Sequence, residues 1–585
     1  MYTLLIVLIS VLVVHNLSIR VSRYLLRSSK NFKKNALNIL KICSIFPSFI
    51  ASFILFEAIA PYLGYLFGST RSFSILFIVS VFVISIFPVS TLNYYRWFQS
   101  KEIQSMNSAL LSLALSTKWR EKLYPKLSKR VIFLSWAAAI SKALGESVAL
   151  RWFLSSDSYL KPFASLRDFL GTQTHTISSL ISSFYFSEGG GKTSRESMFV
   201  FGSALLVVSF SLNYLLMRKG TNYRYKNNYL KKKASTLKFS ILHKLERLKF
   251  SKSSVYFSRY LAFPFHDDSW IQRELKRDRW RSRRDHCVLT LVIGFFALIL
   301  LIIALRGIYF IFFNLFRGFT ESYTVEGLLV PLWNTLLLLF FSITWSLPIA
   351  FFAAFFVSAY ISKWRRLKYL LSSFISGCGT VPPMLWALFG SFLFLDYLKL
   401  SLGRVSIFAG ILTLTLLNLP YLFGKFFNLF EGYLKKYSVP LLRLGLSSYY
   451  LFFIVVKDGL SSLKDFISGS ITRLNGESGL LFITIGASES SRLTLWGHGQ
   501  TLTTKIFTTL LKYKITDIKS VIYETIFCFC ALSLFLYSLF NSFWSLFFRR
   551  MSISLRKRQL ERSLIAAYKK KKSASLAKLA SAFPT

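Results

Sequence analysis

The chain has 585 residues, 53% of them hydrophobic, and its formal net charge is +48. Soluble globular domains do not combine so much apolar sequence with so much charge, and this class is excluded. Apolar windows of about 20 residues, long enough to cross roughly 30 Å of hydrocarbon, recur along the chain and alternate with Lys/Arg-rich stretches. We therefore expect an all-α polytopic membrane protein.

Hydropathy predicts about eleven membrane spans. The first, “MYTLLIVLISVLVV”, has no basic residues before it and no small-residue cleavage site after it. We expect it to be a retained span and not a signal peptide. In chain order the predicted spans cover roughly 1–18, 38–66, 74–95, 131–150, 197–217, 287–313, 328–361, 370–396, 404–424, 451–471 and 519–547.

The basic segments predict the orientation. The Lys/Arg-rich segment 218–286 is expected inside the cell, because basic loops resist translocation. The alternative, a nucleic-acid-binding surface, would need a longer and more regularly patterned basic domain, so no nucleic acid is expected as a partner. The other basic stretches then fall on the cytoplasmic side, whereas 151–196 and 480–518, which are rich in Ser, Thr and Gly, fall outside; these basic stretches are 18–34, 96–130, 362–369, 425–450 and the tail 549–585.

The linker 218–286 separates two membrane halves, 1–217 and 287–548, and three features recur in the same order in both. Transporters are commonly built from such paired halves. The repeated features are a Pro-containing turn (44–53 and 379–390), a helical patch in a long inside loop (108–119 and 439–450), and the motifs “KALGES” (142–147) and “RLNGES” (473–478).

Each of these motifs places a cation four residues before a glutamate, at Lys142 and Glu146 and at Arg473 and Glu477. On a helix the two side chains share one face. A charge at membrane depth costs about 2.5–3.5 kcal/mol, so it normally faces a partner or a watery path. Two ion pairs that only orient helices are one interpretation. The repetition favours the other, a pair of cations near a central axis that attracts a small anion.

The glycines of the motifs allow two interpretations as well. They permit close helix packing, or they break the helix so that backbone N–H groups face an anion. The residues predicted to line the substrate path are Lys142, Gly145, Glu146, Ser147, Arg473, Gly476, Glu477 and Ser478.

No motif predicts catalysis. “SEGGGKTSRES” (187–197) resembles a nucleotide-binding P-loop, but Phe186 occupies the place of its first glycine and the segment is expected outside the cell. The five cysteines have no CxxC spacing, and the six histidines form no constellation, so no metal site and no cofactor are expected.

The segments “ITRLNGESGLLFITIG” (471–486) and “AISKALGESVAL” (139–150) resemble the R-A-L-G-E-T signature of the membrane subunits of phosphate-specific ABC importers. Residues 287–548 look like a PstA-type subunit, and 1–217 look like the five-helix core of a PstC-type subunit. The resemblance implies two homologous MetI-like permease cores. Lys142 stands where the family has arginine, whereas Arg473 keeps it.

The resemblance also implies that the two inside patches are coupling helices for a separate ATPase; an amphipathic helix resting on the membrane is the alternative. Val439 and Ala109 stand where the family's glutamate is expected. The predicted coupling positions are Ala109, Leu115, Thr117 and Lys118 in the first half and Val439, Gly445 and Ser447 in the second.

The function implied is that of a permease for inorganic phosphate in the bacterial cytoplasmic membrane, which is not itself an enzyme. Its implied partners are a cytoplasmic ATPase dimer, an external phosphate-binding protein and the lipid membrane. Two alternatives remain open: an importer of another oxyanion such as sulfate or molybdate, and a degenerate membrane scaffold or sensor without ATPase coupling.

Overall fold

The computed structural model is almost entirely helical in the part of the chain that it describes, and no strand occurs there, which confirms the predicted all-α class. The described residues are 2–45, 50, 53–55, 57, 75–99, 103, 129–145, 196–197, 199–208, 210–211, 268–317, 326–361, 364–379, 381–443, 450–477, 481–486, 495–512, 521–540 and 542.

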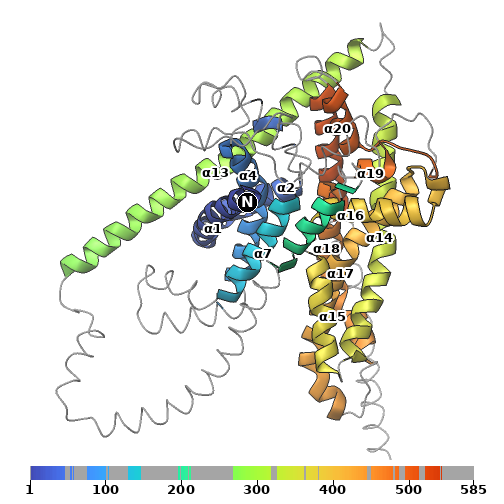
Figure 1. Cartoon of the computed structure of the whole chain (residues 1–585). Coiled ribbons are helices and arrows are strands. Elements are labelled where there is room, and N and C mark those ends of the chain that lie inside the picture. The colour runs from blue at the N-terminus through green and yellow to red at the C-terminus, as the bar shows by residue number, and fades with distance from the viewer. Residues whose placement is uncertain are drawn as a thin grey trace, which may run out of the picture.

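The first half contributes a bundle of apolar helices. Helix α1 packs along α4, and α7 lies against both (Figure 1). The described helices of this half are α1 (Tyr2–Arg27), α2 (Lys30–Ile45), α4 (Ile75–Phe98), α7 (Lys129–Gly145) and a short apolar helix, Phe199–Val208.

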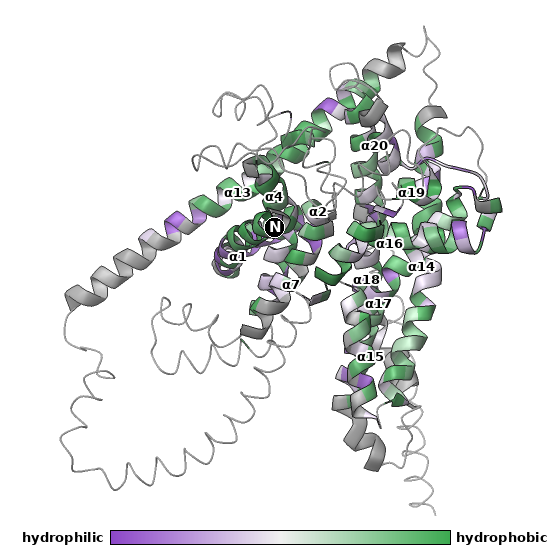
Figure 2. Ribbon diagram, viewed as in Figure 1, coloured by the Kyte–Doolittle hydropathy of each residue, from purple (hydrophilic) through white to green (hydrophobic). Residues whose placement is uncertain are grey.

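A single helix of 50 residues, α13 (Asp268–Arg317), follows the linker and extends over about 75 Å. Its N-terminal part is rich in Arg and Lys. Figure 2 shows hydrophilic residues in this helix, followed by a long hydrophobic stretch. The predicted linker 218–286 therefore does not end as a loop, because its residues 268–286 already belong to the helix of the next span. Hydropathy marks where lipid begins, but Arg, Lys, Glu and Leu all favour helix on either side of that point.

The second half is built around α14 (Glu326–Ala359) and α17 (Ile407–Arg443), which pack along each other. Helix α17 continues well past the predicted span 404–424, so residues 425–443 of the predicted inside loop are helical. The remaining helices of this half are α18 (Tyr450–Glu477), α19 (Phe482–Ile485), α20 (Leu502–Lys512) and Val521–Phe540.

The predicted span 370–396 is not one helix. Helix α15 (Arg365–Cys378) ends before the Pro382–Pro383 pair, and α16 (Pro383–Gly390) starts there with proline in its first turn. Proline cannot donate a backbone hydrogen bond and restricts the residue before it, so a continuous helix is unfavourable here. A π-helical turn, Ser391–Tyr397, and a short 3-10 helix, Leu400–Gly403, complete the segment.

Among the described residues, six helices are long and apolar enough to cross a membrane, which confirms a polytopic membrane protein. The remaining predicted spans correspond to shorter, broken, partly described or more polar helices, so the total of about eleven stays a prediction. The six are Leu5–Leu26, Phe77–Phe98, His286–Phe312, Leu328–Ala359, Ile407–Leu434 and Val521–Phe540.

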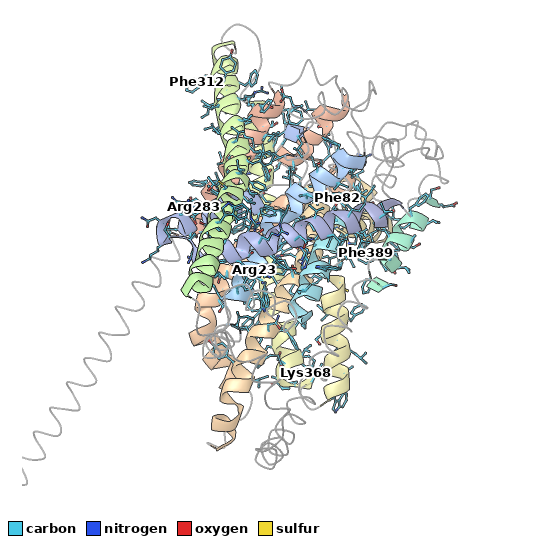
Figure 3. The ribbon with its side chains drawn as sticks, turned by 90° about the vertical axis from the view of Figure 1, so that its left-hand side faces the viewer. Arg23, Phe82, Arg283, Phe312, Lys368 and Phe389 are labelled. Carbon is cyan, nitrogen blue, oxygen red and sulfur yellow. The ribbon has the colours of Figure 1, made fainter. Side chains whose placement is uncertain are left out.

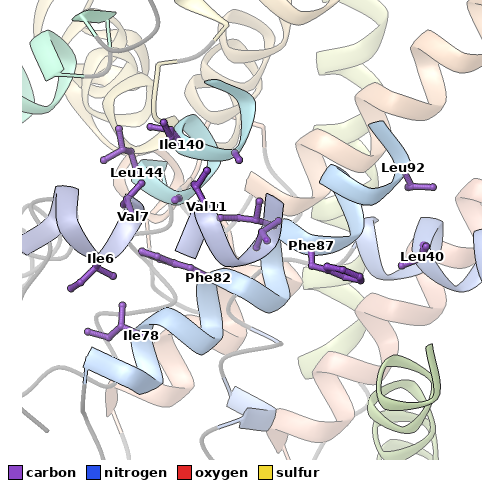
Figure 4. Close-up of a cluster of buried hydrophobic side chains, with 14 of the residues drawn as sticks. Ile6, Val7, Val11, Leu40, Ile78, Phe82, Phe87, Leu92, Ile140 and Leu144 are labelled. Atoms are coloured by element: carbon purple, nitrogen blue, oxygen red, sulfur yellow. The ribbon is translucent and has the colours of Figure 1, made fainter. Parts of the chain in front are cut away.

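One hydrophobic cluster joins the two halves. Figure 4 shows its first-half part, where Phe82 of α4 lies among side chains of α1 and α7. The same cluster includes Phe296 of α13, whose ring stacks on Phe87 with centroids 5.8 Å apart, and Met384 of α16. In Figure 3 the labelled Phe312 marks the upper end of α13.

A polar cluster forms a second junction. Arg306 Nη1 of α13 donates to Glu57 Oε1 of the first half at 2.6 Å and to Tyr523 Oη of the last span at 2.9 Å. Tyr523 Oη in turn donates to Glu57 Oε2. The guanidinium also lies 5.0 Å from the centre of the Tyr523 ring. Three segments that are distant in sequence are thus held at one point, beside the apolar cluster that includes Tyr523.

Close packing of α13 against the last span requires a glycine beside this junction. A Cβ at Gly307 would overlap the Cβ of Phe527, whereas a Cβ at Gly294, on the same helix, would meet nothing within 4 Å. We expect Gly307→Ala to lower the free energy of unfolding by about 1–3 kcal/mol, the usual cost of overpacking. Thermal melting of the purified protein in detergent measures this. Gly294→Ala is the control, and an equal melting temperature for the two variants would contradict the packing.

Candidate functional site

The two Gly-Glu motifs lie at the ends of helices. Helix α7 ends at Gly145 and α18 ends at Glu477, and each has its cation in the last turns. The carbonyl end of a helix attracts positive charge, which favours Lys142 and Arg473 in these positions. The described residues therefore place carbonyl groups at the motifs. Glu146, Ser147 and Ser478 lie outside the described residues. Gly476 and Glu477 are the last two residues of α18, and the side chain of Glu477 is not described.

Lys142 binds the neighbouring helix. Its Nζ donates a hydrogen bond to the backbone carbonyl of Ser85 in α4, with an N···O distance of 3.1 Å. Ser85 lies three residues before Pro88, inside α4. Pro88 removes the N–H that would bond to the Ile84 carbonyl and its ring disturbs this turn, and a carbonyl oxygen with two lone pairs, such as that of Ser85, can accept a further hydrogen bond from outside the helix. The half-buried lysine thus has a neutral partner on α4.

Arg473 also binds a backbone carbonyl, in the second half. Its Nη2 donates to the backbone carbonyl of Gly379, with an N···O distance of 3.4 Å. Gly379 lies three residues before Pro382, in the break between α15 and α16. In each half, therefore, the cation of the motif contacts the carbonyl three residues before a proline.

The two cations are also linked through packing. Ala143 and Leu144, which follow Lys142, belong to the same hydrophobic cluster as Val381 and Met384, which follow the carbonyl that binds Arg473. The short helix α16 thus joins the surroundings of both motifs.

A second cation accompanies Arg473. The guanidinium carbon of Arg473 lies 5.5 Å from the centre of the Tyr421 ring in α17, and Lys425 Nζ lies 5.4 Å from the same centre. Both distances are within the range of cation–π attraction. Gly469 of α18 leaves the space in which the Tyr421 hydroxyl lies, because a Cβ there would overlap Tyr421 Oη.

The first half adds a third cation to this group. Arg96, in the last turn of α4, acts electrostatically on both Tyr421 and Lys425, and so does Asp465 of α18. We call Arg96, Lys425, Arg473, Asp465 and the Tyr421 ring the cation cluster. Its described members are three cations and one carboxylate. Arg96 and Asp465 are exposed, whereas Lys425 and Arg473 are partly withdrawn from solvent; positive charge in such a position is costly, so the cluster favours a bound anion.

Sequence reasoning identified Arg473 but missed the rest of the cation cluster. Tyr421 and Lys425 are four residues apart on α17, so they share a face. Together with the rarity of cations in membrane spans, this spacing could have marked Lys425. Arg96 gave no such signal, because it joins the cluster through the contact between the two halves.

One of the predicted coupling positions, Val439, lies within the described residues. Val439 lies on α17, which runs to Arg443, so the expected separate loop helix is a continuation of α17 on this side. The side chain of Val439 is not described. The other predicted positions, Ala109, Leu115, Thr117, Lys118, Gly445 and Ser447, lie outside the described residues.

Two curated proteins are similar to the chain over most of its length. A phosphate transport system permease protein PstA homolog of Mycoplasma pneumoniae is 26% identical over 436 residues, 69% of this chain and 65% of that protein. A protein of the same description from Mycoplasma genitalium is 26% identical over 444 residues, 72% of this chain and 67% of that protein. The chain thus spans about 65% of the length of the first relative. No family model and no solved structure matches the chain.

The charge excess of the cation cluster predicts a response to anions. We expect a tetrahedral oxyanion, phosphate or sulfate, to raise the melting temperature of the purified protein at constant ionic strength. Arg96→Gln removes one cation and should weaken this response, because less positive charge then needs an anion. Arg20→Gln, on α1, is the control. An unchanged anion response in Arg96→Gln would contradict the cluster.

Proposed function

Because the chain is related to phosphate transport permeases, as its Gly-Glu motifs predict, we propose that it is the membrane permease of an ATP-driven importer of inorganic phosphate. The observation that supports this best is the cation cluster, in which Arg96 of the first half joins Lys425 and Arg473 of the second. A path for an anion between the two halves needs positive charge from both of them.

In this proposal Lys142 and Arg473 attract the anion during passage. Glu146 and Glu477 hold the two cations in place and prevent the empty site from trapping phosphate. The glycines and serines of the motifs line the same path. The hydrogen bonds of Lys142 and Arg473 to carbonyls are compatible with this role, because a neutral acceptor leaves the positive charge available to an anion.

We further propose that residues 1–217 and 287–548 are homologous permease cores in one chain. Lys142 contacts α4, whereas Arg473 contacts the break between α15 and α16, so support for a duplication comes from the packing of the helices that carry the motifs. In each half the helix that carries the motif also packs against a proline-containing helix, α7 against α4 and α18 against α17.

Energy would come from a separate ATPase dimer on the cytoplasmic face, bound near 108–119 and 439–450, with a phosphate-binding protein on the external face. The cytoplasmic linker and tail, and the bacterial cytoplasmic membrane as the location, belong to the same proposal. ATP hydrolysis in the partner would switch the halves between outward and inward access.

Asp465 favours phosphate over sulfate as the substrate. At neutral pH, phosphate retains a proton on one or two of its oxygens, whereas sulfate retains none. A carboxylate among the cations can accept a hydrogen bond from that P–OH group, but it repels fully ionised sulfate. A hydrogen bond to a charged group contributes about 1.5–3 kcal/mol, which is sufficient for discrimination.

Neutralising the two motif cations tests the path. We expect Lys142→Gln with Arg473→Gln to abolish most phosphate uptake by cells, because the path then loses both of its repeated charges. Uptake of labelled phosphate is measured at equal membrane expression, with Arg404→Gln, an exposed cation outside the motifs, as the control. Unchanged transport in the double variant would sink the proposed role of these residues.

Replacing Asp465 tests the choice of substrate. Asp465→Asn should lower about tenfold the sulfate concentration that halves phosphate uptake, since tenfold corresponds to about 1.4 kcal/mol. Lys464→Gln, the neighbouring position on α18, is the control. If sulfate competes equally in both variants, Asp465 does not contribute to selection.

A further inference from the structure

Tyr421 holds two like charges near one ring. Lys425 follows it by one helical turn on α17, and Arg473 approaches from α18, at 5.4 and 5.5 Å from the ring centre. The face of an aromatic ring is negative, so it attracts a cation without cancelling its charge.

The backbone of α18 is shaped to admit this ring. Asp465, Gly469 and Arg473 follow each other at intervals of four residues, so they share the face of α18 that meets Tyr421. Gly469 is the member of this row that lies against the hydroxyl end of the tyrosine, where any Cβ would overlap Oη. The fit of the tyrosine to the glycine fixes the ring in the plane from which it reaches both cations.

We propose that Tyr421 is a positioning residue that sets the orientation in which Arg473 meets one tetrahedral oxyanion, and that it holds Lys425 beside the same ring. This inference rests on the proposed function for the identity of the anion, phosphate. Tyr421 itself does not bind the anion. It sets where the two cations are, and Gly469 sets where Tyr421 is.

Two contacts of Arg473 act on different parts of its guanidinium group. Its hydrogen bond to the Gly379 carbonyl fixes one nitrogen of the guanidinium, and the Tyr421 ring fixes the plane. A planar guanidinium presents several N–H donors in a fixed fork, so a small change in its plane changes how it meets an oxyanion. Loss of the ring should therefore weaken anion binding more than it weakens the fold.

Four variants separate positioning from ordinary packing. Tyr421→Phe keeps the ring and should leave the KM for phosphate uptake nearly unchanged. Tyr421→Leu removes the ring and should raise KM about five- to tenfold, the effect of losing cation–π attraction at a partly buried site. Gly469→Ala should raise KM similarly, because the new methyl group displaces the hydroxyl.

The fourth variant combines Gly469→Ala with Tyr421→Phe. Without Oη the nearest ring atom, Cζ, lies 3.1 Å from the position of the new Cβ, a contact that a small shift relieves. KM should then return to the value of Tyr421→Phe. Gly424→Ala is the control, because a Cβ at that glycine on α17 meets nothing within 4 Å.

A merely structural tyrosine would give a different pattern. Tyr421→Leu would then lower the amount of protein and the maximal uptake rate at an unchanged KM, and that result would overturn the proposal. Failure of Tyr421→Phe to rescue Gly469→Ala would overturn it as well.

The same variants are also tested without transport, through the shift in melting temperature that phosphate or sulfate causes. If the wild type takes up no phosphate but still shows the oxyanion shift, the proposed function fails, and the shift alone decides the role of Tyr421. Tyr421→Leu should then lose most of the shift, and Tyr421→Phe should keep it.

Discussion

The cost of positive charge between apolar helices is the constraint on which the rest of this structure depends. Taking a charge out of water costs several kcal/mol even after relaxation, and a second like charge nearby adds to this. Neutral groups are among the partners that meet this cost: the carbonyls of Ser85 and Gly379 and the ring of Tyr421. These neutral groups stabilise the cations without cancelling their charge.

The packing between the halves determines which cations meet. A shared hydrophobic cluster joins α1, α4 and α7 to α13 and α16, and the Glu57–Arg306–Tyr523 junction adds a second connection. Through these contacts the last turn of α4 comes within electrostatic reach of α17, and Arg96 joins Lys425. A movement of one half against the other would change this cluster first, since only Arg96 belongs to the first half.

The sequence predicted the features that depend on local pattern. Apolar windows and charge placement gave the all-α polytopic class, and two short motifs gave both the family resemblance, which the relatives confirm, and the cation Arg473. The helix boundaries could not be predicted, because α13 and α17 continue into polar sequence that hydropathy interprets as loop although its residues favour helix. The Tyr421–Gly469 fit and the arrival of Arg96 depend on tertiary packing and leave no mark in a single sequence.

The central claim is that cations of both halves form one oxyanion site around Tyr421. It is tested most directly by determining the structure of the full chain in lipid nanodiscs with arsenate, a heavier tetrahedral oxyanion that keeps a proton at neutral pH as phosphate does. The account predicts one arsenate in the cation cluster, within hydrogen-bonding distance of Arg473. Arsenate bound elsewhere, with an empty space at this residue, would contradict it.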